Sequence, residues 1–281
     1  MMLYDRKSGS VIPELESGKK GLEFLYNTTL GRMILKIATM PFISNLSRAY
    51  YGSVLSKHSI KGFVKKNSID ITDEEISEFK TFNEFFTRRR QVPFCNEESV
   101  LCAVADSKLS YYDISPELRI NVKKSNYSVA EILDDEKMAQ RFSGGCCMVF
   151  RLAVDDMHHY FFFDKGNVIS QKKIKGELHT VRPISEKYNV FTRNKREVTV
   201  METKNFGLAA YVEVGALMVG RIVNAPIGEF ERGTEKGYFE FGGSTVIVLL
   251  EKKPQFDSDI QKANAEGIET KVVAGERIGQ I

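Results

Sequence analysis

The 281-residue sequence has little cysteine, little histidine and no long hydrophobic run. Its four cysteines form no C-x-x-C pair, and two of them, Cys146 and Cys147, are adjacent. Because vicinal cysteines bridge only with strain, the pattern predicts buried thiols in a reducing compartment rather than a disulfide framework. No uninterrupted apolar stretch reaches the roughly 18 to 20 residues that a bilayer span needs, so we expect no transmembrane helix.

The net charge is only +3, and the basic excess lies in the first 90 residues. Between Gly21 and Gly52, apolar and aromatic residues recur at roughly helical spacing, with lysines and arginines among them. Two interpretations are open. A basic amphipathic helical pair lies on an anionic membrane surface, or the apolar stripe packs on the protein's own core. We expect no nucleic-acid partner.

The two parts of the chain differ in pattern. Residues 1–90 read as mainly helical, whereas residues from about 100 onward form short β-type runs punctuated by glycine. One clear helical segment, Ser128 to Phe142, interrupts these runs. We therefore predict an α+β fold, with a helical N-terminal region over residues 1–90 and a β-rich body over residues 91–281.

The most informative motif is Gly242-Gly243-Ser244-Thr245, which follows an aromatic stretch and precedes an apolar run. A glycine-rich turn that enters a buried strand would explain the tetrapeptide by itself. Glycine also permits the backbone conformation that brings a serine hydroxyl against the preceding carbonyl. Attack of Ser244 Oγ on the Gly243 carbonyl, followed by elimination and hydrolysis, would leave a pyruvoyl group on the 38-residue chain 244–281.

Self-cleavage of this kind needs a base and usually a carboxylate that orients it. Of the four histidines, His158 and His159 stand out, because Asp155 and Asp156 precede them and an aromatic run follows. Alternation along an extended segment places the two imidazoles on opposite faces, so only one can easily point into a given site. A metal site is a weaker interpretation, since no spaced partner cluster occurs elsewhere. A polar turn beside a strand is a further one.

Eight separated stretches occur in the order typical of one family. They are Phe82–Arg89, Ala103–Ser107, Asp156–His158, Gly176–Val181, Phe191–Arg196, Val214–Ala216 with Val219–Gly220, Gly237–Val246 and Gly275–Gly279. On these motifs the chain resembles phosphatidylserine decarboxylase, the pyruvoyl-dependent membrane-associated enzyme, and specifically the bacterial subgroup without a transmembrane anchor. The stretches run from Phe82 to Gly279.

The resemblance implies a carboxy-lyase of phospholipid biosynthesis that is made as a proenzyme. Cleavage between Gly243 and Ser244 would give a β chain, 1–243, and an α chain, 244–281, whose pyruvoyl group derives from Ser244 and serves as the covalent cofactor. Asp106 resembles the acid of the processing relay, and His158 its base. Phosphatidylserine would form a Schiff base with the pyruvoyl group and leave as phosphatidylethanolamine and CO₂. His158 is expected to assist proton transfer there, as a group that titrates near neutral pH.

The lipid substrate favours the membrane interpretation of Gly21–Gly52 and implies a peripheral protein on the cytoplasmic face of the cell membrane. One position departs from the family pattern, which often has a second histidine where this sequence has Phe161. Either His158 does both jobs, which we favour, or His159 compensates, or processing is impaired. The alternatives are therefore a pyruvoyl decarboxylase of a soluble amino acid and an unprocessed, non-catalytic membrane-binding homologue. Whether the chain forms a homodimer is left open.

Overall fold

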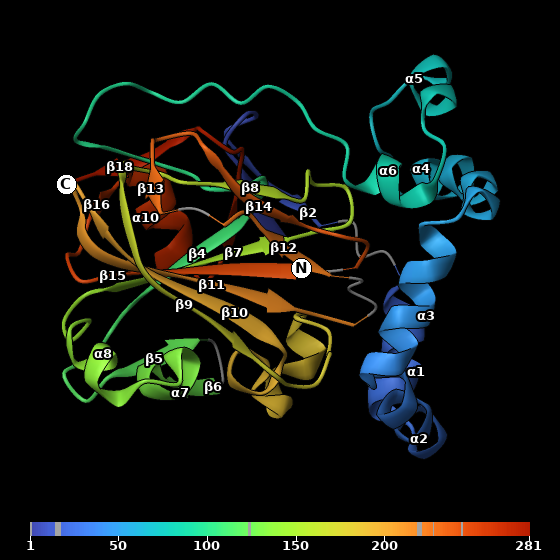
Figure 1. The fold of residues 1–281 in the computed structure, drawn as a ribbon, viewed down its shortest axis with the longest axis horizontal. Helices are drawn as coiled ribbons and strands as arrows, with labels where there is room; N and C mark the ends of the chain where they lie inside the picture. Colours follow the sequence, from blue (N-terminus) through green and yellow to red (C-terminus); the bar gives the residue numbers. More distant parts are fainter. Residues whose placement is uncertain (1, 15–17, 123–124, 218–220, 227, 243) are drawn as a thin grey trace.

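The computed structural model describes residues 2–14, 18–122, 125–217, 221–226, 228–242 and 244–281. A column of short helices stands beside a β-rich body (Figure 1). The helices in the described ranges are α1 (Lys19–Asn27), α2 (Thr29–Ala38), α3 (Pro41–Tyr51), α4 (Ser59–Asn67), α5 (Asp73–Glu78), α6 (Phe82–Phe86), α7 (Val129–Leu133), α8 (Glu136–Gln140), α9 (Val190–Arg193) and α10 (Ser258–Ala265), with the 3-10 helices η1 (Val54–His58) and η2 (Pro183–Tyr188). The predicted α+β fold, with N-terminal helices followed by a β-rich body, is confirmed.

The body is built on one large sheet. The strands are β1 (Met2–Asp5), β2 (Ser10–Pro13), β3 (Val100–Cys102), β4 (Ser107–Asp113), β5 (Arg119–Val122), β6 (Ser125–Ser128), β7 (Cys146–Leu152), β8 (His159–Phe161), β9 (Gly166–Ile174), β10 (Arg196–Thr203), β11 (Gly207–Gly215), β12 (Ile222–Asn224), β13 (Glu229–Phe230), β14 (Glu235–Phe239), β15 (Ser244–Leu250), β16 (Gln255–Phe256), β17 (Glu269–Val272) and β18 (Arg277–Gln280). The large sheet has the order β13-β9-β10-β11-β15-β7-β4-β17-β1-β2, and a three-stranded sheet has the order β12-β14-β8.

Strand β15 lies in the middle of the large sheet, between β11 and β7, and every one of its seven residues is buried. Because both faces of the sheet are covered at this point, the strand reads as a continuous apolar run rather than an alternating one. Val246, Val248 and Leu250 enter the core on one face, which we call the front face. Ile247 and Leu249 enter the core on the back face. Alternation therefore assigns Ser244 to the front face.

The three-stranded sheet packs on the front face. It contributes Tyr160 from β8, Ile222 from β12 and Phe239 from β14 to the core that contains Val246. The back face is covered by α7 and α9, which contribute Ile132 and Val190 among others. This sheet of β12, β14 and β8, which we call the small sheet, therefore brings β8 and the segment leading into Ser244 over the front face.

The helical arm comprises α1 to α6 with η1. It stands along one side of the body in Figure 1, with α1 to α3 at one end and α4 to α6 at the other. Helix α5 begins at a capping box, in which Thr72 and Glu75 each accept a hydrogen bond from the other's backbone N–H. A cluster of aromatic residues that includes Phe82, Phe85 and Phe86 joins the arm to Phe241 of the body. No helix in the described part of the chain is long and apolar enough to cross a membrane.

Several details differ from the sequence-based expectation. Strand β1 lies in the region expected to be helical, yet it pairs in parallel with β17 and so belongs to the large sheet. The expected helix over 128–142 is split at Asp134, which adopts a left-handed conformation with φ 51°. Helix α10 was not predicted. All four cysteines are free, as expected, but Cys95 is exposed.

Candidate functional site

Ser244 is the first residue of β15, opposite Gly215 of β11 and Leu152 of β7. Its side chain is fully buried, and its Oγ has no hydrogen-bond partner among the described residues. Gly242, two residues earlier, has φ +137°, a value that side-chain-bearing residues rarely adopt. The other half of the predicted cleavage site, Gly243, lies outside the described residues. A buried, unpaired hydroxyl thus sits on a central strand directly after a glycine-dependent turn.

His158 precedes β8 and is also fully buried. Its Nδ1 lies 3.0 Å from the backbone oxygen of Asp156, and because a carbonyl can only accept, Nδ1 carries the proton and donates. The Nε2 atom is then a hydrogen-bond acceptor, and it has no partner within the described part of the chain. Burial lowers the pKa of His158 to about 3, so the imidazole is neutral at pH 7.

One aromatic ring connects His158 with the segment that leads to Ser244. The ring of Phe86 in α6 lies 4.1 Å from the His158 ring and 5.1 Å from that of Phe241, measured between centroids. Phe241 stands three residues before Ser244 and packs in the aromatic cluster of the helical arm. The arm therefore forms one wall of the region that holds His158 and the entry to β15.

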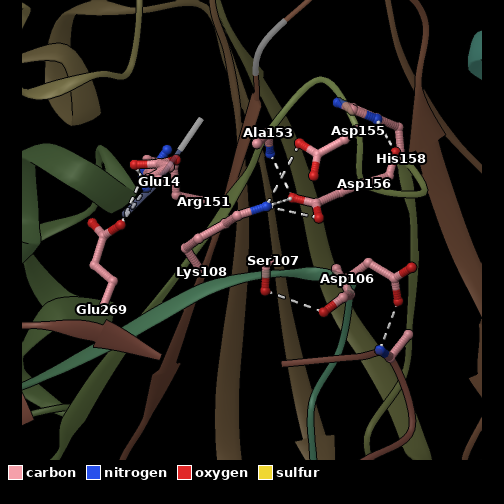
Figure 2. A network of polar contacts seen from close by, with 12 residues as sticks. Glu14, Asp106, Ser107, Lys108, Arg151, Ala153, Asp155, Asp156, His158 and Glu269 are labelled. Atoms are coloured by element: carbon pink, nitrogen blue, oxygen red, sulfur yellow. Dashed lines mark hydrogen bonds and ion pairs between the residues drawn. The ribbon is translucent and has the colours of Figure 1, made fainter. Parts of the chain in front are cut away.

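The backbone carbonyl that orients His158 is itself held by a buried clamp, shown in Figure 2. The carboxylate of Asp156 accepts hydrogen bonds from Lys108 Nζ, at 2.7 and 2.8 Å, and from the backbone N–H of Ala153 at 2.7 Å. Both charged side chains are buried, so each compensates the other. Sequence reasoning named Asp156 but missed Lys108, although a lysine inside a buried strand is a signal worth following.

His159 makes a separate set of contacts. Its Nε2 lies 2.9 Å from the backbone oxygen of Thr87, its Nδ1 lies 3.3 Å from Glu235, and its ring stacks on Tyr238. Phe161, where the family often has a second histidine, is buried in a small apolar cluster that includes Ala274. Phe161 therefore acts as a packing residue in this chain.

Asp106 does not contact His158 in this structure. Its carboxylate pairs with Arg90 at 2.6 Å and accepts a hydrogen bond from the backbone N–H of Ala274 at 2.8 Å. Figure 2 shows its side chain directed away from the Lys108–Asp156 clamp. No described hydrogen bond or ion pair joins Asp106 to His158, so their roles as acid and base of processing stay predictions.

A second buried network ties the small sheet to the front face near Ser244. Lys236 of β14 pairs at 2.8 Å with Glu213 of β11, and the two side chains are 1% and 0% exposed. The amide of Asn224, in β12, donates to both Glu213 and Glu197 at 3.0 Å and accepts from Lys236 at 3.1 Å. The hydroxyl of Tyr160 donates to the same amide oxygen at 2.9 Å. Strands β12 and β14 therefore each supply a polar anchor to the large sheet, and Tyr160 of β8 supports the anchor of β12.

The described residues contain no group of three or more His, Cys, Asp or Glu side chains that could hold a metal ion. Among the residues suggested for such a site, Asp156 is engaged by Lys108 and the Nδ1 atom of His158 by a backbone carbonyl. The chemistry available here is therefore that of a hydroxyl and a neutral imidazole.

Comparison with known proteins agrees with the motifs. The family model of phosphatidylserine decarboxylase matches residues 82–280. A phosphatidylserine decarboxylase proenzyme 2 from Clostridium acetobutylicum is 43% identical over 99% of this chain and 98% of its own length. The chain belongs to the phosphatidylserine decarboxylase family. A proenzyme from Ruminiclostridium cellulolyticum is 40% identical over 99% of this chain and 97% of its own length, and one from Clostridium tetani is 39% identical with the same coverage.

The phosphatidylserine decarboxylase family model matches the β-rich body and leaves out most of the helical arm. Residues 82–280 include Asp106, His158 and Ser244, whereas helices α1 to α5 precede the matched range. The full-length relatives nevertheless cover 99% of this chain. The helical arm is thus shared with these relatives, although most of it lies outside the family model.

Proposed function

We propose that the chain cleaves itself between Gly243 and Ser244 and then converts phosphatidylserine into phosphatidylethanolamine and CO₂. The observation that carries the proposal is that Ser244 Oγ and His158 Nε2 are both buried and that neither has a hydrogen-bond partner among the residues that the structure describes. An unpaired buried polar atom costs about 1–3 kcal/mol, so two such atoms with complementary donor and acceptor roles favour a site of chemistry. The relatives' description as proenzymes supports a processing step.

The proposed cleavage uses the chain's own groups. Neutral His158 accepts the proton of Ser244 Oγ at Nε2 while Oγ attacks the carbonyl carbon of Gly243, breaking the peptide C–N bond and forming an ester. Loss of the Cα proton of residue 244 then breaks the Cβ–Oγ bond, which releases the Gly243 carboxylate and leaves dehydroalanine. Water converts this enamine into the pyruvoyl group and ammonia. Each step balances without a metal or an external oxidant.

Residue 244 is well placed to carry the resulting group. In the uncut chain it pairs with β11 and β7, and both of these strands would belong to the other chain after the cut. A pyruvoyl group supplies a ketone that accepts the electron pair of the departing carboxylate. His158 would move protons beside it, although its pKa of about 3 means that it does not titrate near neutral pH in the uncut chain.

Asp106 keeps the role of processing acid as a proposal. Arg90 and the Ala274 N–H both contact Oδ1 of this carboxylate, so we expect the Arg90 ion pair to compete with the proposed role. Replacement Asp106→Asn should then slow cleavage, whereas Arg90→Gln should leave it unchanged or faster. Equal slowing by both variants would instead favour a purely structural ion pair.

We assign the helical arm to the anionic membrane surface where the lipid substrate lies. Most of the large apolar side chains of α2, α3, η1 and the link between α2 and α3 face outward, although Leu35 is buried. They include Leu30, Met33, Ile37, Met40, Phe42, Leu46, Val54 and Leu55, each at least 50% exposed. Exposed lysines such as Lys20 and Lys36 accompany them. An apolar face flanked by cations is the arrangement that binds at a lipid interface.

The proposal is tested with two substrates that are each labelled at the serine carboxylate. One is phosphatidylserine in vesicles, and the other is the free amino acid serine. We expect labelled CO₂ from the vesicles, with Ser244→Ala as the inactive control. Faster release from free serine would favour the soluble amino acid decarboxylase. No release from either, with an uncut chain, would favour the non-catalytic homologue.

A further inference from the structure

A polar pocket of about 360 Å³ lies where the helical arm meets the segment that leads into Ser244. We call it the α3 pocket. It is lined by Asn45, Arg48, Ala49, Gly52, Asn83 and Glu240. Asn83 closes one side, because its Oδ1 accepts a hydrogen bond from the backbone N–H of Phe241 at 3.3 Å. The pocket therefore presents one cation, one anion and two amides beside the predicted cleavage segment.

Arg48 is held in a way that leaves its fork open. Its Nε lies 3.1 Å from Glu240 Oε2, and the two side chains are 49% and 13% exposed. Within the described ranges the two Nη groups have no hydrogen-bond partner. The guanidinium meets Glu240 at Nε as an ion pair, and its paired Nη donors match the oxygens of a phosphate in a bidentate contact. Glu240 thus places a carboxylate beside Arg48.

The α3 pocket is close to the chemistry described above. Asn83 and Phe86 lie three residues apart on α6, or about 4.5 Å along the axis at roughly 1.5 Å per residue. Phe86 is the ring that packs on His158. Glu240 stands four residues before Ser244. A ligand held by Arg48 is therefore near both the imidazole and the entry to β15.

The pocket also adjoins the apolar face of the arm. Phe42, Leu46 and Tyr50 recur every four residues on α3 and are 72%, 59% and 41% exposed. Successive residues turn by about 100°, so Asn45 lies beside this stripe, about 60° from Phe42. Arg48, two residues from both Leu46 and Tyr50, projects to the opposite side of the helix. One helix thus offers an apolar stripe to acyl chains and a polar side that faces the pocket.

We propose that the α3 pocket binds the headgroup of phosphatidylserine, with Arg48 on the phosphodiester and Glu240 facing the ammonium. This inference rests on the proposed function, because it identifies where the substrate of that reaction first docks, before its amine leaves Glu240 for the group on residue 244. The amides of Asn45 and Asn83 supply further donors to the phosphate. A ligand that carries both charges satisfies both members of the Arg48–Glu240 pair, whereas a plain phosphate satisfies one.

The test measures binding without catalysis. The full-length Ser244→Ala chain is titrated calorimetrically with glycerophosphoserine, which has the headgroup and no acyl chains, and with glycerol 3-phosphate, which lacks the ammonium. We expect glycerophosphoserine to bind more tightly. Adding Arg48→Gln should weaken both ligands by about tenfold or more, the usual effect of losing a charged hydrogen bond. Glu240→Gln should remove the preference for glycerophosphoserine.

Lys66→Gln is the matched control, because it removes one exposed positive charge from the same arm outside the pocket. It should leave both affinities unchanged. Equal loss in Lys66→Gln and Arg48→Gln, or no loss in Arg48→Gln, would overturn the assignment. If Arg48→Gln fails to fold, Arg48→Lys replaces it, since it keeps the charge and loses the fork.

The two proposals fail separately. Absence of CO₂ release by the wild-type chain, with headgroup binding that depends on Arg48, would overturn the decarboxylase and leave the pocket. Release of CO₂ by an enzyme whose uncut form binds glycerophosphoserine equally with and without Arg48 would overturn the pocket alone.

Discussion

The helical arm and the β-rich body use similar apolar residues in opposite ways. In the body, Val246 to Leu250 are fully buried between two covered faces of the large sheet. In the arm, α3 keeps Phe42 and Leu46 largely exposed. Charged groups follow the reverse order, with Lys236 and Glu213 buried in the body and Lys61 and Asp73 exposed on the arm. The contrast agrees with the proposal that the body cleaves itself and the arm contacts a membrane.

The largest expected effect concerns histidines from the two regions. His158→Asn should slow self-cleavage by roughly 100-fold or more, the usual contribution of a general base. His58, exposed on η1 in the arm, is the matched control, and His58→Asn should cleave normally. His159→Asn tests whether the neighbouring imidazole compensates. Gel electrophoresis measures the cleavage rate of each variant. Normal cleavage by His158→Asn would show that His158 is not the base of self-cleavage.

The second effect compares ion pairs. Lys236→Met leaves Glu213 buried without its cation, which should lower the free energy of unfolding by about 3–5 kcal/mol. Lys61→Met breaks an exposed pair on the arm and should cause no measurable change. Urea unfolding of the uncut Ser244→Ala chain measures both. A mild cost for Lys236→Met would show that the network does not hold the small sheet on the body.

The third effect is the pH dependence that His158 gives to the body. Burial lowers its pKa to about 3, against about 6.5 in the unfolded chain, so the unfolded chain binds the extra proton between these values. Stability is full above about pH 6.5 and falls toward pH 3 by up to roughly 1.4 kcal/mol per pH unit. His158→Phe, in the uncut chain, should remove this component between pH 7 and pH 5. An unchanged pH dependence would contradict the buried neutral state.

The smallest expected effect separates the arm from the body directly. Phe42→Ser with Leu46→Ser should reduce sedimentation with anionic vesicles by about tenfold, because both side chains would lose an apolar environment. The unfolding midpoint should stay the same, since the two residues are exposed. Point substitutions suit this test better than removal of residues 1–52, which would also remove β1 from the large sheet. Unchanged sedimentation would contradict a role of this apolar face in membrane binding.

The sequence predicted the elements whose signal is local. The apolar run behind Ser244 reads as a buried strand, and Thr72 with Glu75 reads as a helix start, because neighbouring residues determine both. The motifs also identified the family. The sequence did not predict whether the apolar face of the arm is exposed, because periodicity shows that a helix has an apolar face but not what covers it.

Contacts between distant residues could not be predicted. Lys108 meets Asp156 from another strand, and β1 joins β17 from the far end of the chain. The pairing of Asp106 with Arg90 likewise depends on where the segment after α6 lies on the body, and no local sequence pattern encodes that position. A motif was therefore enough to name Asp106 as the proposed acid, whereas its ion pair with Arg90 could be found only from the structure.

Intact mass spectrometry of the purified wild-type chain tests the central claim most directly. The account predicts two chains, of which the smaller comprises residues 244–281 and carries a pyruvoyl group in place of an N-terminal serine. The Ser244→Ala chain should remain whole under the same conditions. A single uncut wild-type chain of 281 residues would contradict self-cleavage at Ser244.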